Sequence, residues 1–164
     1  MRKIIYFILP FIILILLNNC SGYKPIFAAG NIEFNINKHT IKDNKILGNK
    51  FYSKLYNLSK SNKNNPEAQS VHVSIKASKE KTATVKDNTG KILEYKVTLN
   101  VSVIMKNFLT NNEILNQNFA SFASYKIQDQ YFESIKLENI TINNLVNKTY
   151  QDLLIRISEN MLTK

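Results

Sequence analysis

SVHVSIKAS at residues 70–78, followed by LEYKVTLNVSVIMK at residues 93–106, is the part of the sequence that decides the fold. Apolar and polar side chains alternate along both segments, which predicts two strands that each bury one face. The apolar positions are Val71, Val73, Ile75, Ala77, Leu93, Tyr95, Val97, Leu99, Val101, Val103 and Met105. The connecting segment KEKTATVKDNTGK contains a turn region at 88–90, so the two strands form a long β-hairpin with a basic tip.

The sequence before the hairpin predicts a strand and then a helix. Residues 31–36 alternate in the same way as the hairpin strands. Between about residues 44 and 60 apolar side chains recur at helical spacing, with Asp43 or Asn44 available as the N-cap. Gly48 costs about 1 kcal/mol inside a helix, which leaves open a helix start after this residue. Residues 59–67 form a loop.

The sequence after the hairpin predicts one more strand, at 115–127, and a terminal helix from about 129 to 162. The apolar seam of that helix comprises Ile135, Ile142, Val146, Leu153 and Ile157. The expected fold is therefore α+β, a two-layer sandwich with two helices packed on a four-stranded, mainly antiparallel sheet. It would be one domain, covering residues 31–164.

Residues 1–19 have the three parts of an export signal. Arg2 and Lys3 give a positive end, and an uninterrupted apolar run of 14 residues extends from Ile4 to Leu17. A bilayer-spanning helix needs about 20 apolar residues, so a signal peptide is favoured and a short, tilted membrane anchor is the alternative.

Cys20, the only cysteine, follows this run after two asparagines. A single cysteine forms no intramolecular disulfide, a zinc site needs several ligands, and a thiol nucleophile needs a base beside it. Lipid attachment is left: Leu17 and Cys20 fit the Leu-x-x-Cys lipobox of bacterial lipoproteins, although Asn19 stands where that motif usually has Gly, Ala or Ser. Acyl chains contribute about 0.8 kcal/mol per buried methylene, which is ample for stable anchoring. In bacterial lipoproteins an aspartate directly after the cysteine favours retention in the inner membrane. Because this chain has Ser21 at that position, the outer membrane is favoured. Residues 20–30 would form a lipidated tether.

Without residues 1–19 the chain keeps 20 basic and 12 acidic residues, a net charge of +8. On the periplasmic side of an outer membrane, the available polyanions are phosphorylated lipids and lipopolysaccharide, so we expect no nucleic-acid partner. Five lysines surround the hairpin tip and could bind phosphates on a lipid headgroup: Lys76, Lys79, Lys81, Lys86 and Lys91. The alternative is that they only keep an exposed hairpin soluble.

The sequence lacks the motifs that mark common enzymes. It has no Gly-rich phosphate loop, no G-x-S-x-G and no H-E-x-x-H. His39 and His72 stand alone, and Asp87 and Glu94 have no partner close in sequence. We therefore expect no catalytic residue, no metal site and no cofactor, and hold a hydrolase as the remote alternative.

Two segments and the order of elements resemble the LPS-assembly lipoprotein family (LptE), in particular its alphaproteobacterial branch. The first segment is CSGYKPIF at 20–27, where Gly22, Tyr23, Lys24, Pro25 and Ile26 match the family's usual start and Ser21 is inserted before them. The second is FASYKIQDQYFESI at 122–135, an aromatic strand that leads through a short turn into the terminal helix. The resemblance extends over essentially the whole chain.

The resemblance implies a non-enzymatic outer-membrane lipoprotein of the lipopolysaccharide translocon. Such proteins plug and help assemble the outer-membrane β-barrel that inserts lipopolysaccharide, and they contact lipopolysaccharide itself. The expected partners are thus that barrel, lipopolysaccharide and the outer membrane, and the five hairpin lysines become candidate lipopolysaccharide contacts on charge grounds. The alternative is another periplasmic lipoprotein, such as an auxiliary subunit of a lipid or solute transporter.

Overall fold

A computed structural model of the chain describes residues 33–61, 65 and 68–162. The predicted signal peptide at 1–19 and the predicted lipidated tether at 20–30, with Cys20, lie outside the described residues. In the described part of the chain, no helix combines the length and the apolar character that crossing a bilayer requires.

The predicted hairpin is the centre of the fold. Strand β2 (Gln69–Lys86) pairs with strand β3 (Ile92–Asn107) in antiparallel register, with Ile75 opposite Val103. Both strands continue further into the connecting segment than the sequence pattern predicts, and the turn is confined to residues 87–91. Asp87 closes this turn, because its Oδ1 accepts hydrogen bonds from the backbone N–H groups of residues 89 and 91, each at 2.9 Å.

The sheet has four strands in the order β1-β2-β3-β4, which confirms the predicted α+β fold. Strand β4 (Glu113–Lys126) lies antiparallel to β3, whereas strand β1 (Phe34–Asp43) lies parallel to β2. The parallel pair follows from the chain order, since helix α2 (Lys45–Ser61) crosses back over the sheet between β1 and β2. Strand β1 extends to Asp43, beyond the strand predicted at 31–36, whose first two residues lie outside the described part of the chain.

Helix α2 begins at Lys45, before Gly48 and not after it. Asn44 is the N-cap, because its Oδ1 accepts the backbone N–H of Leu47 at 3.0 Å, and Asp43 turns the chain with a φ of 62°. Gly48 is required where α2 approaches the sheet: a Cβ at this position would lie 2.3 Å from Cγ2 of Ile41. The glycine that weakens the helix locally is thus the residue that allows α2 to pack against β1.

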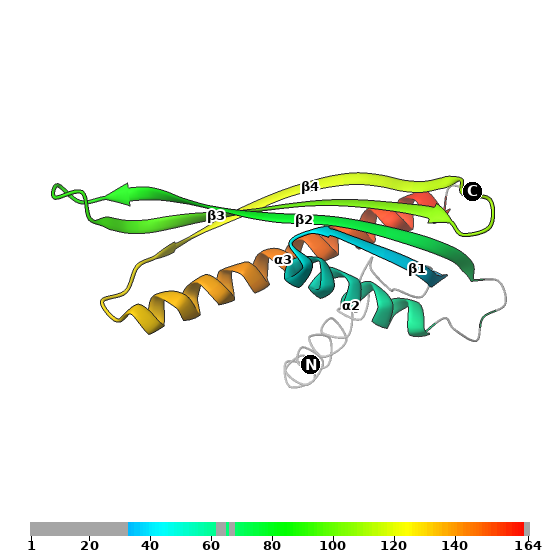
Figure 1. Cartoon of the computed structure of the whole chain (residues 1–164), viewed down its shortest axis with the longest axis horizontal. Helices are drawn as coiled ribbons and strands as arrows, with labels where there is room; N and C mark the ends of the chain where they lie inside the picture. The colour runs from blue at the N-terminus through cyan, green and yellow to red at the C-terminus, as the bar shows by residue number, and fades with distance from the viewer. Residues whose placement is uncertain (1–32, 62–64, 66–67, 163–164) are drawn as a thin grey trace, which may run out of the picture.

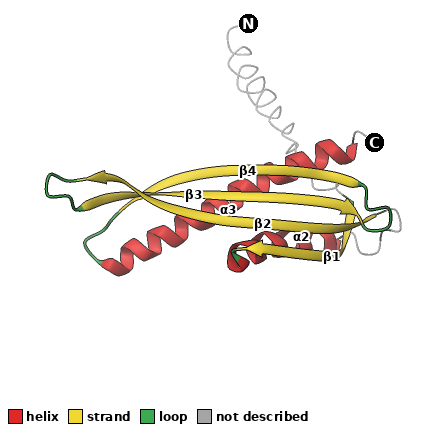
Figure 2. Cartoon of the chain, turned by 45° about the horizontal axis from the view of Figure 1, so that its top comes forward, coloured by secondary structure: helices red, strands yellow, loops and turns green. Residues whose placement is uncertain are grey.

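Helix α3 (Tyr131–Leu162) covers β3 and β4, and both helices lie on the same face of the sheet (Figures 1 and 2). The core between the layers holds Phe34, Leu47, Phe51, Leu55, Val71, Val73, Ile75, Val97, Leu99, Val101, Val103, Met105, Ile142, Leu145, Val146, Leu153 and Ile157. Polar contacts of buried side chains include a 2.8 Å hydrogen bond between the hydroxyls of Ser121 and Thr149, and one of 2.9 Å from the backbone N–H of Ile36 to the hydroxyl of Ser59. The predicted seam of α3 is confirmed except at Ile135, which is 38% exposed.

The two ends of the molecule differ in their layers. Strand β1 and helix α2 occupy one half of the molecule, while the β2–β3 hairpin and the first turns of α3 project beyond them (Figure 1). We call the end with the β2–β3 turn the distal end, and the end with the β3–β4 turn the proximal end. At the distal end the hairpin and α3 diverge, which is why Ile135 is left partly uncovered.

Candidate functional site

The five hairpin lysines do not gather around one loop, as the sequence had led us to expect. Only Lys86, the last residue of β2, and Lys91, the last residue of the turn, lie at the tip. Lys76 lies well back along β2, where its ammonium is 3.7 Å from a carboxylate oxygen of Asp43. The remaining two, Lys79 and Lys81, continue the register of the buried side chains and so point toward α3.

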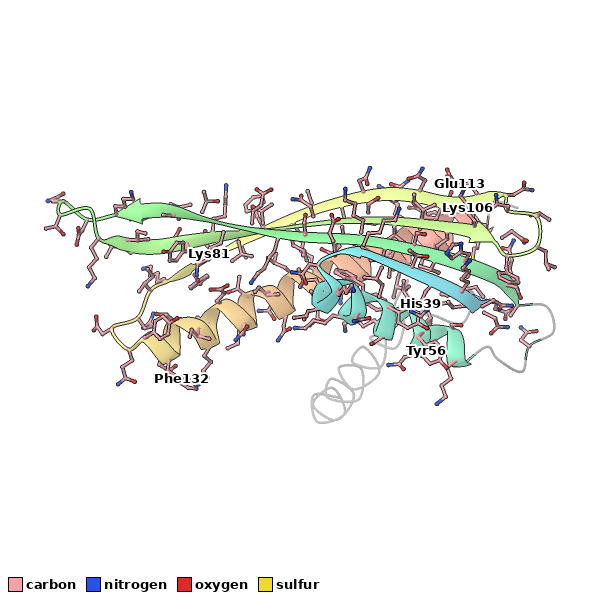
Figure 3. All side chains as sticks on the ribbon, in the orientation of Figure 1. His39, Tyr56, Lys81, Lys106, Glu113 and Phe132 are labelled. Carbon is pink, nitrogen blue, oxygen red and sulfur yellow. The ribbon has the colours of Figure 1, made fainter. Side chains whose placement is uncertain are left out.

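Lys79 and Lys81 converge on one carboxylate of α3. The Nζ of Lys81 lies 2.6 Å from Oε2 of Glu138, and the Nζ of Lys79 lies 3.3 Å from Oε1. The Glu138 side chain is 20% exposed, and the side chain of each lysine is 37% exposed. Figure 3 shows Lys81 in the space between the hairpin and α3.

Two tyrosines complete this cluster from the neighbouring strands. The hydroxyl of Tyr125, on β4, donates to Oε2 of Glu138 at 2.9 Å. The Lys81 ammonium lies 4.2 Å from the ring centroid of Tyr95 and 5.6 Å from that of Tyr125, within the range of cation–π attraction. We call these five residues, from four elements, the distal cluster: Lys79, Lys81, Tyr95, Tyr125 and Glu138.

The charges of the distal cluster are fixed at neutral pH. Partial burial raises the pKa of Glu138, but hydrogen bonds from Lys81, Tyr125 and Lys79 outweigh this effect and lower the pKa to about 2. Partial burial likewise lowers the pKa of Lys81, and its bond to Glu138 reverses that effect, so the net pKa is raised. An ionised carboxylate therefore bridges two ammonium groups, and the cluster holds one net positive charge.

A groove of about 440 Å³ opens beside the distal cluster, between the hairpin and the start of α3. Tyr95, Tyr125 and Ile135 give it apolar walls. Its charged lining is mixed, with ammonium groups from Lys81 and Lys91 and carboxylates from Asp129 and Glu138. Tyr131, which is 81% exposed, also lines the groove, and Phe132, which is 71% exposed, lies next to it along the chain (Figure 3). Apolar walls beside charges of both signs suit an amphipathic molecule.

The histidines have structural partners. The ring of His39 stacks on Tyr52 of α2, with centroids 3.9 Å apart, and Nε2 of His72 lies 3.1 Å from the hydroxyl of Thr40. Partial burial and then the neighbouring lysines lower the pKa of His72. Among residues 33–61, 65 and 68–162, no three His, Cys, Asp or Glu side chains gather in a way that could hold a metal ion.

Sequence reasoning missed Glu138 and the part played by Tyr125. The helical spacing could have predicted the inward position of Glu138, because this residue lies on α3 one turn before Ile142, on the side that carries the buried residues. The strand alternation could have predicted the position of Lys79 and Lys81. They follow Ala77 at every second residue and so lie on the same face of β2 as the buried side chains. Cys20 lies outside the described residues, so its predicted acylation stays a prediction.

Neither a protein-family model nor a curated protein sequence matches the chain, whereas several solved structures do. A lipoprotein B from Nitrosomonas europaea has a TM-score of 0.57 at 15% identity, over 84% of this chain and 90% of that chain. A minor lipoprotein from Acinetobacter baumannii has a TM-score of 0.56 at 13% identity, over 79% and 93%. The rare lipoprotein B from Shewanella oneidensis has a TM-score of 0.50 at 15% identity, over 79% and 94%. At these identities the likeness is one of fold: the chain has the fold of small bacterial lipoproteins.

Proposed function

We propose that this chain is an outer-membrane lipoprotein and, more specifically, the lipoprotein subunit of a lipopolysaccharide translocon. In this role it is lipidated at Cys20, plugs and helps to assemble the β-barrel that inserts lipopolysaccharide, and contacts lipopolysaccharide itself. It acts by binding, without catalysis.

The observation that carries the proposal is the agreement between the two parts of the chain. The first 20 residues have the layout of a lipoprotein signal that ends in a cysteine, and the described domain has the fold of bacterial lipoproteins over most of its length. The two observations are independent, because the fold comparison rests on a domain that begins after the signal.

The distal end supports the choice of lipopolysaccharide as a ligand. Lipopolysaccharide carries phosphates next to acyl chains. The distal groove offers the ammonium groups of Lys81 and Lys91 next to aromatic walls, and the carboxylates of Asp129 and Glu138 also line it. Lys86 and Lys91 form no ion pair within the described residues, so their charge is available for a phosphate. Lys79 and Lys81 would have to share theirs with Glu138.

Co-purification tests the role. The full chain, expressed with a C-terminal affinity tag in a Gram-negative cell and extracted in mild detergent, should retain an outer-membrane β-barrel of the lipopolysaccharide-assembly type. Cys20→Ala should lose the incorporated fatty acid. Recovery with an inner-membrane transporter in place of the barrel would reject the translocon role and favour an auxiliary transporter subunit.

Binding to purified lipopolysaccharide tests the ligand. We expect Lys86→Gln/Lys91→Gln to weaken binding, and to make it less sensitive to salt because the attraction to phosphate is screened. The matched control is Lys42→Gln/Lys106→Gln, which removes the same charge from the sheet face that the helices leave uncovered, where the two lysines pair with Lys76 and His72. Equal binding by both variants would show that the tip lysines serve solubility only.

A further inference from the structure

The helix layer carries a second cationic surface, separate from the hairpin lysines. Helix α2 contains four lysines, Lys45, Lys50, Lys54 and Lys60, and no acidic residue. The middle of α3, residues 139–151, contributes Lys148 and again no acidic residue. The two segments are free of carboxylates over about five and nearly four helical turns.

These two segments face a common groove. Helices α2 and α3 lie side by side in both views (Figures 1 and 2), and a groove of about 700 Å³ runs between them. Lys50 and Lys54 line it from α2, and Asn143 and Asn147 line it from α3. The Lys50 ammonium donates to Oδ1 of Asn143 at 2.6 Å, a neutral partner that leaves its charge uncompensated. We call the outer side of the two segments the helix face.

The lysines of the helix face differ from those of the hairpin in their pairing. Lys76, Lys79 and Lys81 are each within 4 Å of a carboxylate oxygen, whereas none of the five helix-face lysines forms an ion pair with a described carboxylate. Ile46, which is 73% exposed, lies among them at the start of α2 and also lines the groove. An unpaired basic helix with an exposed apolar side chain is typical of surfaces that rest on membranes.

We propose that the helix face docks on an anionic phospholipid surface. Ammonium groups on flexible stems suit phosphates that are mobile in a headgroup layer, and the absence of carboxylates removes repulsion from them. Ile46 would enter the headgroup boundary, as apolar side chains of interfacial helices do. The groove is open, and most of its lining residues carry amide, hydroxyl or ammonium groups, so it favours a layer of headgroups over one enclosed small molecule. This inference goes beyond the proposed function and does not need lipopolysaccharide.

Paramagnetic broadening in nanodiscs tests the docking. The full chain is reconstituted in nanodiscs of phosphatidylcholine alone, or of phosphatidylcholine and phosphatidylglycerol in equal amounts, each doped with a headgroup-nitroxide lipid. We expect the amide signals of Asn49, Ser53 and Asn57 to broaden in the anionic discs and much less in the neutral ones. Amides of Asn100 and Ser102, on the opposite face of the sheet, should stay sharp in both.

Two matched variants separate this surface from the hairpin. Lys50→Gln/Lys54→Gln should shift docking toward the undocked state roughly fivefold for each lysine removed. Lys86→Gln/Lys91→Gln, with the same change in charge, should leave the broadening unchanged. Broadening of α2 that is equal in neutral and anionic discs, or equal loss in the two variants, would overturn the proposal. Either result would leave the lipopolysaccharide role untouched, since that role is read from lipopolysaccharide binding and barrel capture.

Discussion

Glu138 shows how one residue can hold two layers together. It lies one turn before the buried Ile142, on the sheet-facing side of α3, and is nevertheless charged. A carboxylate is stable there because three donors from two strands reach it: Lys79, Lys81 and the hydroxyl of Tyr125. The same contacts join the sheet to α3 at the distal end, where the apolar core does not extend.

Removal of the Glu138 charge should destabilise the protein. Glu138→Gln keeps the size of the side chain but leaves the ammonium groups of Lys79 and Lys81 facing each other, so we expect the free energy of unfolding to fall by about 1 to 2 kcal/mol. Denaturant unfolding followed by circular dichroism measures the change. The control on the same helix is Glu133→Gln, which removes a surface contact to Lys136 of 3.8 Å and should cost less than about 0.5 kcal/mol. Equal losses would show that the distal cluster is an ordinary surface ion pair.

Acid should erase the contribution of Glu138. Its pKa in the folded protein is about 2, below the ordinary value of 4.5, so its stabilising effect is present above about pH 4.5 and is lost as the pH falls toward 2. The difference in unfolding free energy between the wild type and Glu138→Gln should therefore shrink between neutral pH and about pH 3. Unfolding curves of both proteins across this range measure it. A difference that stays constant would mean that Glu138 acts through packing and not through its charge.

At the scale of single elements, sequence periodicity predicts which face of a strand is buried. It does not predict a side-chain position that depends on one distant partner. The alternation in 70–78 and 93–106 predicted the hairpin and its buried face, because one-sided burial leaves a mark every second residue. The same parity extends through Lys79 and Lys81, yet their charge led us to assign them to the tip. Their inward position depends on Glu138, about 60 residues away, and no local pattern in the hairpin reports it.

Gly48 is a second case, in which helix propensity alone gives the wrong sign. Gly48→Ala should favour an isolated α2 by about 1 kcal/mol, but the added Cβ would overlap Cγ2 of Ile41. Because overpacking costs about 1 to 3 kcal/mol, we expect a net loss of stability, measured by thermal or denaturant unfolding. Ile41→Ala removes the overlapping atom, so the double variant should lose less than the sum of the two single variants. A more stable Gly48→Ala would show that α2 can move away from β1 without cost.

At the scale of the molecule, the two layers of the sandwich extend unequally and are held together by different contacts at the two ends. The proximal half combines β1, α2 and the buried core, whereas the distal half depends on the hairpin, the start of α3 and the distal cluster (Figure 1). Sequence reasoning predicted the layers and the order of elements, since these follow from amphipathic patterns. It did not predict the unpaired basic helix face, although the absence of acidic residues in α2 was visible in the sequence.

This uneven construction predicts that the distal end opens without global unfolding. In native-state hydrogen exchange, amides of the hairpin between residues 82 and 95 should exchange through a lower free energy than those of Val101 and Val103. Two variants distinguish local from global opening. Gly48→Ala perturbs a contact that stays intact when only the distal end opens, so it should speed exchange at Val101 and Val103 and leave the hairpin unchanged. Glu138→Gln weakens a contact that both openings break, so it should speed exchange at both places. Faster exchange of the hairpin in Gly48→Ala would mean that the two ends open as one cooperative unit.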